Sequence, residues 1–265
     1  MKITIPDSLH FLQPVAVPLI RFGSHHDGGY VGSPKCVRPN SVVISLGLKD
    51  NWSFEDAHYR AAPNVTVRSY DPTVSTWVFI RSVFVGFRKL LMFQDLTLWG
   101  RSKILAGYLT FYRGKDRKHY RLWVKANSDL PNSISLAEIL NQTEGKDVVL
   151  KIDIEGDEYQ VLKELRSNPD RRRVLALFVE FHDIDQRWDE FVELLESLKP
   201  DFSLIHLHVN NFNKVLTTLG VPRVLELSFL RNDLVESEGL RSRLPIANLD
   251  FPNDLGREDF EISFD

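Results

Sequence analysis

The stretch Val148–Tyr159, VVLKIDIEGDEY, decides the fold class. Its first part, Val148–Ile154, is aliphatic or β-branched at most positions and predicts a buried strand. Gly156 then permits a sharp turn, and the acidic residues after it suit the positive N-terminal end of a helix. A strand that passes through a short turn into a helix is typical of an α/β protein with a parallel sheet.

The same alternation of β-branched runs and helical patterns extends through most of the chain. Further strands are predicted at Val42–Ser45, Val65–Tyr70, Leu175–Phe181, Ser203–Val209 and Val224–Phe229. Helices are predicted at Ile134–Asn141, Glu158–Arg166 and Trp188–Leu198, and Pro200 ends the last of them. We therefore expect a mostly parallel sheet whose strands are joined by crossover helices, with helices on both faces.

Length and composition limit the class of protein. With 265 residues, 43% hydrophobic and 26% charged, the chain fits a single globular domain, residues 1–265, that carries an insertion. No stretch approaches the roughly 18 uncharged apolar residues of a membrane helix, and the N-terminus has no signal-peptide pattern, so we expect a cytoplasmic protein. The single cysteine, Cys36, excludes an internal disulfide and a thiolate metal cluster.

The insertion comprises residues 75–125. It contains 11 Lys or Arg against two Asp, and 11 of the 29 aromatic residues, although the net charge of the chain is -3. We predict one or two amphipathic or buried helices, with VFIRSVFVGFRKLLMF (78–93) as the strongest candidate, and then a basic loop, RGKDRKHYR (113–121). Such a segment suits sugars with acidic groups, single-stranded nucleic acid or a membrane surface, or it packs as a helical cover on the domain.

Polar residues follow the first two predicted strands, where ligands of open parallel sheets bind. Gly47 lets the backbone turn sharply after the first strand, with Asp50 close behind, but the GxGxxG pattern of dinucleotide sites is missing. The second strand ends in Asp71, Pro72 and Thr73. An ionised carboxylate at this place can accept both hydroxyl protons of a ribose, which makes Asp71 the best single candidate for a cofactor contact.

The later strand ends are rich in acids and imidazoles. Alternation along an extended strand places Asp153 and Glu155 on the same side. Glu180 and His182 share a face in the same way, and His208 follows in the next strand. A histidine near neutral pH can act as a general base. If these groups converge, Asp153, Glu180 and His182 could hold a hard divalent cation such as Mg²⁺ or Mn²⁺.

These residues resemble a known family, the FkbM-type and related methyltransferase-like proteins. KIDIEGDEYQVL resembles the signature of the family's fourth strand, and ISLAEIL resembles the helix before it. A more specific resemblance combines Arg21–Gly23, Asp27–Val31, the stretch SLGLKDNWSFE and Asp71–Thr73 with VPRVLELSF and DFPND near the end. Together these motifs cover nearly the whole chain outside the insertion.

The resemblance implies a Rossmann-like domain that binds S-adenosylmethionine. By motif, Asp71 would hold the ribose, and Asp153 and Glu155 would face the transferred methyl group. Ser45 stands where many methyltransferases have an acid, so Asp27 or Asp50 would contact the methionine amino group, and Asp27–Tyr30 would form a lid. The cofactor-binding residues implied in this way are Asp27, Gly28, Gly29, Tyr30, Gly47, Asp50, Phe54, Glu55, Asp71, Pro72 and Thr73.

Our hypothesis is O-methylation of a sugar hydroxyl, in a glycan or a nucleotide-sugar. His182 or His208 would act as the base, and Asp153 with Glu155 would orient the acceptor or a metal bound to it. An RNA methyltransferase is the nearest alternative, because the basic, aromatic insertion also suits single-stranded RNA. An NAD-dependent oxidoreductase is disfavoured by the missing GxGxxG, and a non-catalytic domain is disfavoured because crowded unpaired acids cost stability.

Overall fold

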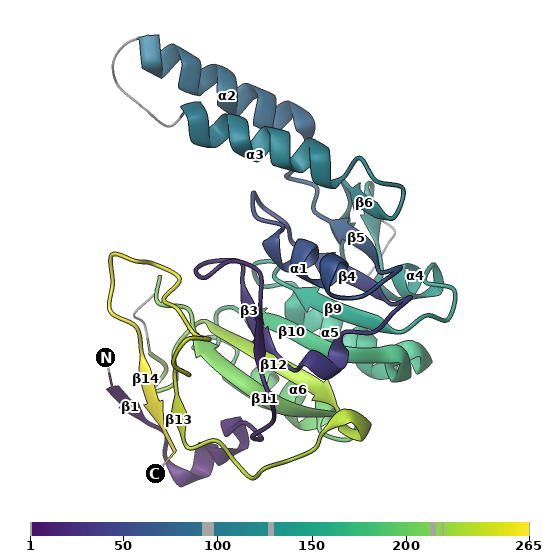
Figure 1. Ribbon diagram of the computed structural model, residues 1–265. Coiled ribbons are helices and arrows are strands. Elements are labelled where there is room, and N and C mark those ends of the chain that lie inside the picture. Colours follow the sequence, from purple (N-terminus) through teal and green to yellow (C-terminus); the bar gives the residue numbers. More distant parts are fainter. Residues whose placement is uncertain (1, 92–97, 127–129, 213–215, 219, 265) are drawn as a thin grey trace.

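The computed structural model describes residues 2–91, 98–126, 130–212, 216–218 and 220–264. A seven-stranded sheet forms its centre, in the order β11–β12–β10–β9–β4–β5–β6 (Figure 1). These strands are β4 (Val42–Leu46), β5 (Thr66–Tyr70), β6 (Arg117–Tyr120), β9 (Val148–Ile152), β10 (Val174–Phe181), β11 (Phe202–Val209) and β12 (Leu225–Arg231). β12 runs antiparallel to both of its neighbours, and the other adjacent pairs are parallel, which confirms the mostly parallel sheet.

The order of the strands reverses at the centre of the sheet. β4 and β9 lie side by side, with Val42 opposite Val148. From β4 the chain continues through β5 and β6 to one edge, whereas from β9 it continues through β10 toward the other. In an open α/β sheet the crevice at such a reversal, beyond the carboxyl ends of the strands, is the usual ligand site.

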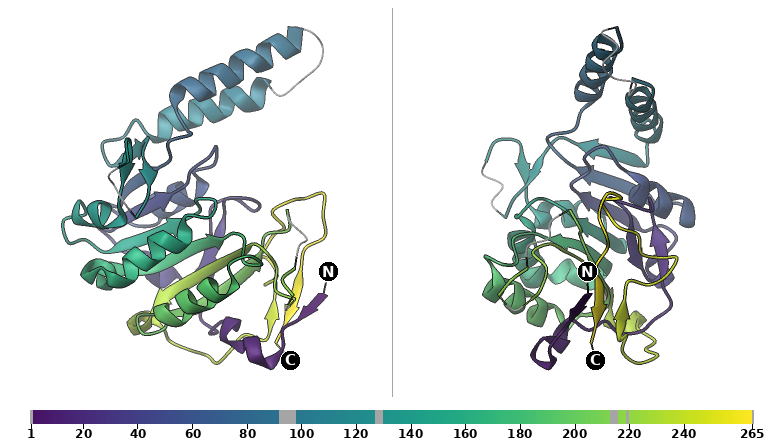
Figure 2. Two further views of the ribbon diagram at one scale, coloured as in Figure 1. Left: turned by 180° about the vertical axis from the view of Figure 1, so that it is seen from behind. Right: turned by 90° about the vertical axis from the view of Figure 1, so that its left-hand side faces the viewer.

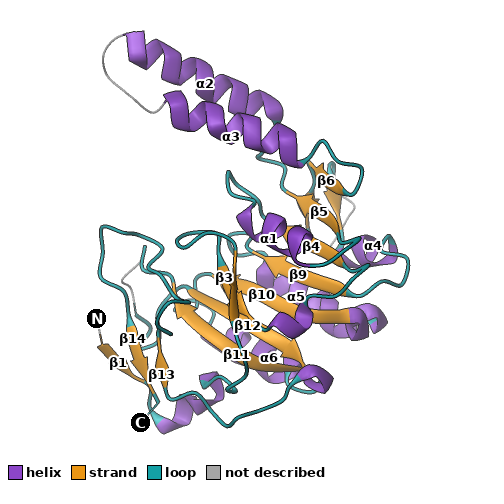
Figure 3. Ribbon diagram, in the orientation of Figure 1, coloured by secondary structure: helices purple, strands orange, loops and turns teal. Residues whose placement is uncertain are grey.

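Helices cover both faces of the sheet, as expected (Figure 3). One face carries α4 (Leu136–Asn141), α5 (Glu158–Ser167) and α6 (Trp188–Leu198). The other carries α1 (Ser53–Ala61) and the hairpin of β2 (Ile20–Phe22) and β3 (Tyr30–Gly32). Aromatic contacts hold each layer: the rings of Phe181 and Phe191 are 5.1 Å apart on the first face, and those of Phe54 and Phe178 are 5.0 Å apart on the second.

Short elements complete the chain. β1 (Lys2–Thr4), β14 (Glu261–Ser263) and β13 (Arg243–Leu244) form a three-stranded sheet, and β7 (Trp123–Val124) pairs with β8 (Ser133–Ile134). Short 3₁₀ helices lie at Asp7–Leu12, Pro34–Cys36, Pro169–Arg173 and Asn232–Leu234.

The insertion forms a helical hairpin between β5 and β6. Its helices, α2 (Thr76–Leu91) and α3 (Leu98–Phe111), lie side by side and extend away from the sheet (Figures 1 and 2). Arg101 joins them by donating a hydrogen bond to Ser82 Oγ at 2.8 Å. No helix in the described residues is long and apolar enough to cross a membrane.

Two predictions about elements need correction. The basic loop predicted at 113–121 contains β6, which pairs with β5 with Val67 opposite Arg117. This strand lies at the edge of the sheet, so its side chains need not be apolar, and the hydrophobic pattern that marks inner strands is absent. The strand predicted to reach Ile154 ends at Ile152. Positions 92 and 93 of the predicted insertion helix lie outside the described residues.

Candidate active site

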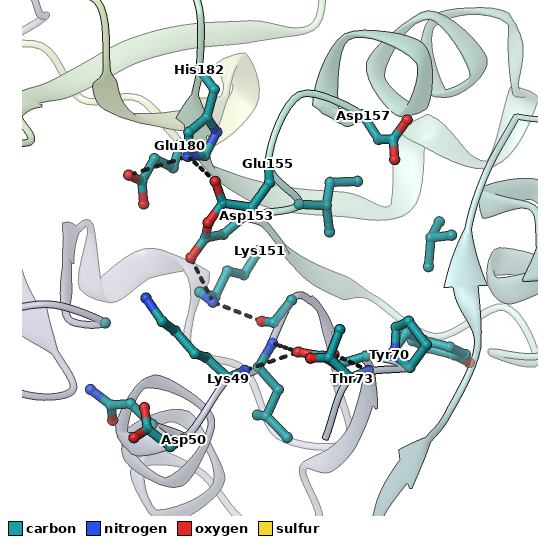
Figure 4. A pocket seen from close by; sticks show the side chains of 18 of the residues that line it. Lys49, Asp50, Tyr70, Thr73, Lys151, Asp153, Glu155, Asp157, Glu180 and His182 are labelled. Carbon is teal, nitrogen blue, oxygen red and sulfur yellow. Dashed lines mark hydrogen bonds and ion pairs between the residues drawn. The ribbon is translucent and has the colours of Figure 1, made fainter. Parts of the chain in front are cut away.

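A pocket of about 600 Å³ opens at the reversal of strand order, where β4, β5, β9 and β10 end (Figure 4). Its wall combines apolar side chains with many carboxyl groups. The lining residues predicted from the sequence are Asp27, Gly28, Gly47, Asp50, Asp71, Pro72, Thr73, Asp153, Glu155, Glu180 and His182. The lining residues that were not predicted include Lys49, Asn51, Leu122, Trp123, Val124, Lys151, Asp157, Asn210 and Phe212.

Gly47 forms the sharp turn after β4. Its φ of +85° lies in the left-handed region, and a Cβ atom at this position would lie 1.8 Å from the carbonyl oxygen of Asp153. The Asp153 N–H donates to the carbonyl of Leu46 at 2.8 Å, so the ends of β4 and β9 are in direct contact. Only glycine permits this approach, and the prediction that Gly47 shapes the pocket agrees with the geometry.

Asp71 joins the loops that follow β4 and β5. One carboxylate oxygen accepts from the backbone N–H groups of Leu48 and Lys49 at 2.9 and 3.0 Å. The other accepts from the N–H and the hydroxyl of Thr73 at 2.8 and 2.6 Å. Burial favours the neutral acid, but these four hydrogen bonds outweigh it and lower the pKa of Asp71. Asp71 thus lines the pocket as an ionised group and also fixes two of its walls.

Lys151 also lines the pocket, although no role was predicted for it. Its ammonium is buried inside β9, donates to the carbonyl of Gly47 at 3.0 Å and lies 3.7 Å from a carboxylate oxygen of Asp153 (Figure 4). Burial favours the neutral amine, but Asp153, Glu55 and other nearby carboxylates outweigh it and raise the pKa of Lys151. The signal was present in VVLKIDI, because a lysine within a buried strand requires charged partners.

Asp153, Glu155 and His182 meet at one point of the pocket, with one ligand atom from each within 4.8 Å of the others. Nε2 of His182 lies 3.5 Å from Oε2 of Glu155 and 3.6 Å from Oε1 of Glu180 (Figure 4). The cause differs from the predicted strand alternation. β9 has ended, and Glu155 has a φ of +53° in the turn, so the turn brings the two acids together.

His182 is held as an imidazolium by the acids around it. Its Nδ1 lies 3.3 Å from Oε1 of Glu158, the same oxygen that accepts from the His182 backbone N–H at 2.7 Å. Burial favours the neutral ring, but the hydrogen bond with Glu158 and the charges of Glu180 and Asp153 outweigh it and raise the pKa of His182 to about 9. Burial and the charge of Asp153 hold the pKa of Glu180 well above its usual range.

Five predicted site residues lie outside the pocket lining, which corrects their expected placement. Tyr30 and Phe54 are buried in an aromatic cluster, with ring centroids 5.6 Å apart, because the β2–β3 hairpin packs against α1. Gly29 supports the preceding loop, where a Cβ atom would lie 1.9 Å from the carbonyl oxygen of Ser24. The remaining two are Glu55 and His208.

Glu55 and His208 are each bound to other side chains. Glu55 is fully buried and accepts a short hydrogen bond from Ser45 Oγ, and burial raises its pKa. His208 lies between Glu226 and Asp259, at 3.4 and 3.3 Å. Burial opposes its charge, but the hydrogen bonds to both acids raise its pKa to about 10. His208 therefore connects β11 and β12 to the C-terminal segment.

Only the first half of the stretch predicted as a lid, Asp27–Tyr30, contributes to the wall of the pocket. Asp27 and Gly28 line the pocket, and Asn51 Nδ2 donates to the Asp27 carbonyl at 2.7 Å. From outside, the His25 ring stacks on Phe251 with centroids 4.4 Å apart. Burial raises the pKa of the Asp27 carboxyl group. The loop is thus held between the pocket and the C-terminal segment.

A family model described as Methyltransferase FkbM domain matches residues 33–204. No curated protein sequence matches the chain.

Solved structures that match the chain include three that share 9–10% of its sequence. The fibrillarin/Nop5p complex matches at 9% identity over 80% of this chain and 91% of that chain, with a TM-score of 0.38. An rRNA methylase from Streptococcus thermophilus matches at 10% identity over 75% and 91%, with a TM-score of 0.37. Precorrin-6y C5,15-methyltransferase from Geobacter metallireducens GS-15 matches at 9% over 75% and 86%, with a TM-score of 0.35. The family match is the deciding finding, and the chain belongs to the FkbM methyltransferase domain family.

Proposed function

We propose that the pocket binds S-adenosylmethionine and that the protein transfers the methyl group to a sugar hydroxyl of a glycan or nucleotide-sugar. The family assignment favours a methyltransferase over an oxidoreductase, and the use of this donor is implied by the fold. The observation that carries the proposal is the charge of the pocket. Seven carboxyl groups line it, namely Asp27, Asp50, Asp71, Asp153, Glu155, Asp157 and Glu180, against the two amines Lys49 and Lys151 and the imidazole of His182.

Even without Asp27 and Glu180, whose pKa values are raised, the five other acids outnumber the three cationic side chains. An excess of acids suits a ligand that carries two positive charges, a sulfonium and an ammonium. S-adenosylmethionine supplies a methyl group on a sulfonium, which an acceptor oxygen can attack directly. Gly47 permits close approach of the backbone, and Asp71, Pro72 and Thr73 line the pocket at the strand end where a ribose binds in such sheets. Asp27 and Asp50 are the candidates for the ammonium, because the buried Glu55 is taken up by Ser45.

Asp153 is the best candidate to accept the hydroxyl proton. His208 lies outside the pocket, and a pKa of about 9 leaves His182 protonated at neutral pH, so neither predicted histidine is a ready base. The Asp153 carboxylate lies in the pocket beside Lys151 and is only partly exposed. A carboxylate is a sufficient base here, since the hydroxyl becomes strongly acidic as its oxygen gains the methyl group.

Asp153, Glu155 and His182 could instead hold a divalent cation. The cation would then bind the acceptor in place of a direct contact with these side chains. Asp153 and Glu155 offer two oxygen ligands, and His182 offers a nitrogen ligand once the cation displaces its proton, with Glu180 next to them. Mg²⁺ favours the oxygens, whereas Mn²⁺ also accepts imidazole. Titration calorimetry with MnCl₂ on the wild type and on Asp153→Asn tests this part, and heat that persists in the variant contradicts it.

The acceptor half of the proposal rests on aromatic side chains at the mouth of the pocket. Trp123 from the insertion and Phe212 after β11 line the pocket, and both are about half exposed. Flat apolar faces of this kind stack on sugar rings. Lys125 lies beside Trp123 and forms an ion pair with Asp157. RNA is the second candidate acceptor, because bases also stack on such rings.

Two measurements test the proposal in order. Titration calorimetry with S-adenosylhomocysteine, and with NAD as control, tests the cofactor: binding of the first alone supports the proposal, and binding of NAD alone refutes it. Transfer of radiolabelled methyl from S-adenosylmethionine to nucleotide-sugars, oligosaccharides and RNA then tests the acceptor. Trp123→Ala should reduce transfer to a sugar with unchanged binding of S-adenosylhomocysteine. Labelling of RNA alone refutes the sugar acceptor.

A further inference from the structure

The hairpin of α2 and α3 exposes an apolar face that the described part of the chain does not cover. On α2, Trp77 is 71% exposed and Phe84 is 65% exposed, and Val78 and Val85 are also open to solvent. Successive helix residues advance by about 100°, so these four and Arg81 lie within one third of the circumference. The opposite side is buried, where Phe79 contacts Trp52 and Tyr108.

We propose that this face of α2, defined by Trp77, Val78, Arg81, Phe84 and Val85, docks onto an anionic lipid surface. A helix that lies in a bilayer interface combines exposed aromatic and aliphatic groups with Arg or Lys that reach the headgroups. Arg81 occupies the centre of the face and is exposed.

The charge of the hairpin supports a phosphate-bearing partner. Neither α2 nor α3 contains an aspartate or glutamate, whereas they contain Arg81, Arg88, Lys89, Arg101 and Lys103. On α3, Trp99 is 71% exposed and the ammonium of Lys103 lies 5.2 Å from its ring. Anionic lipids attract such residues by about 1 kcal/mol each near the surface.

A second copy of the chain fits this face less well. A symmetric contact through α2 would bring Arg81 toward another Arg81, with no carboxylate on either helix pair to compensate its burial. RNA also fits less well: bases could stack on Trp77 and Phe84, but the aliphatic Val78 and Val85 between and beside them would stay in contact with water. In a lipid interface the aliphatic groups enter the acyl boundary and Arg81 pairs with a phosphate.

The hairpin is joined to the pocket, so docking would orient the pocket. α2 begins three residues after Thr73, which lines the pocket. α3 packs on Trp52, where a Cβ atom at Gly107 would lie 2.9 Å from the indole ring. Docking would hold the pocket near acceptors carried on the lipid surface. This last consequence rests on the proposed function, whereas docking itself does not.

Vesicle sedimentation of the full chain tests the docking without any methyl transfer. The vesicles contain either phosphatidylcholine alone or phosphatidylcholine with phosphatidylserine. We expect sedimentation with the anionic vesicles, reduced about tenfold in Phe84→Glu and in Arg81→Glu. Leu255→Glu is the matched control, because Leu255 is a 73% exposed apolar residue outside the hairpin and should behave as wild type. Circular dichroism of each variant checks the fold.

Four results overturn the proposal: no sedimentation with either vesicle, equal sedimentation with both, equal loss in Leu255→Glu, or wild-type sedimentation of Phe84→Glu. Sedimentation velocity without vesicles would show a dimer lost in Phe84→Glu if the face binds a second copy. A fluorescence titration with single-stranded RNA would show binding lost in the same variant if the partner is RNA. Methyl transfer that fails while vesicles are still bound refutes the proposed function alone.

Discussion

Gly47→Ala should damage both stability and the site, because the added methyl group has no room. A Cβ atom at Gly47 would lie 1.8 Å from the carbonyl oxygen of Asp153, and ordinary contact begins at 3.4 Å. The oxygen must therefore retreat by about 1.6 Å, since backbone atoms cannot rotate away as a flexible side chain can. The displaced turn is the one that carries Asp153 and Glu155 into the pocket.

The expected size of the effect follows from two contributions. The left-handed φ of +85° costs alanine about 1 kcal/mol of unfolding free energy, and the forced contact adds about 1–3 kcal/mol. Misplacement of a reacting group by 1 Å costs about 100-fold in rate. We therefore expect Gly47→Ala to lose about 2–4 kcal/mol of stability and at least about 100-fold in methyl transfer.

Gly145→Ala is the matched control for backbone strain. Gly145 has a φ of +75°, and a Cβ atom there meets no atom within 4 Å. It should lose only about 1 kcal/mol and keep wild-type binding of S-adenosylhomocysteine. Urea unfolding and titration calorimetry on both variants provide the comparison. If Gly47→Ala loses no more stability than Gly145→Ala and binds the ligand with the same Kd, the close contact does not shape the site.

Three further outcomes follow from the titratable groups. The pKa of His208 is raised to about 10, so its stabilising charge is fully present below the unfolded pKa of about 6.5 and is lost as pH rises to 10. The unfolding free energy should thus fall by up to about 1.4 kcal/mol per pH unit in this window, with a smaller slope in His208→Gln measured by urea unfolding. Turnover should fall as pH rises through about 9, because His182 then loses the positive charge that holds Glu155 and Glu180 in place. An increase in turnover over the same pH range would identify His182 as the base. Asp71→Asn turns an N–H donor toward other donors, so it should cost about 1–3 kcal/mol of unfolding free energy and weaken the binding of S-adenosylhomocysteine. Thr73→Val removes only one donor and should cost about 1 kcal/mol. Equal losses of the two variants in urea unfolding and calorimetry would contradict this.

The fold was predictable wherever the hydrophobic pattern is strong. All six predicted strands lie in the central sheet, and the helix predicted at Trp188–Leu198 has these bounds. The insertion was correctly predicted as helical, and it forms two helices in the described residues. β6 was missed because an edge strand pairs through its backbone and needs no apolar side chains.

The site was predictable in its position but less so in its chemistry. Residues just after the strands line the pocket, because parallel strands end at one rim. The roles of single residues depend on neighbours that are distant in sequence. Glu158, the first residue of α5, raises the pKa of His182, and Asp259 binds His208 outside the pocket lining. Such contacts leave no local pattern in the sequence.

The arrangement of β6 also bears on how the chain avoids self-assembly. Within the part of the chain that the structure describes, β6 pairs only with β5, so its other side offers backbone groups to which a further strand could add. Lys118 is exposed on this strand, and the guanidinium of Arg117 lies over the rings of Tyr59 and Phe111. An identical edge approaching from a second molecule would bring like charges together. Arg117 and Lys118, predicted to lie in a ligand-binding loop, therefore also disfavour the addition of a second molecule's β6 to this sheet edge.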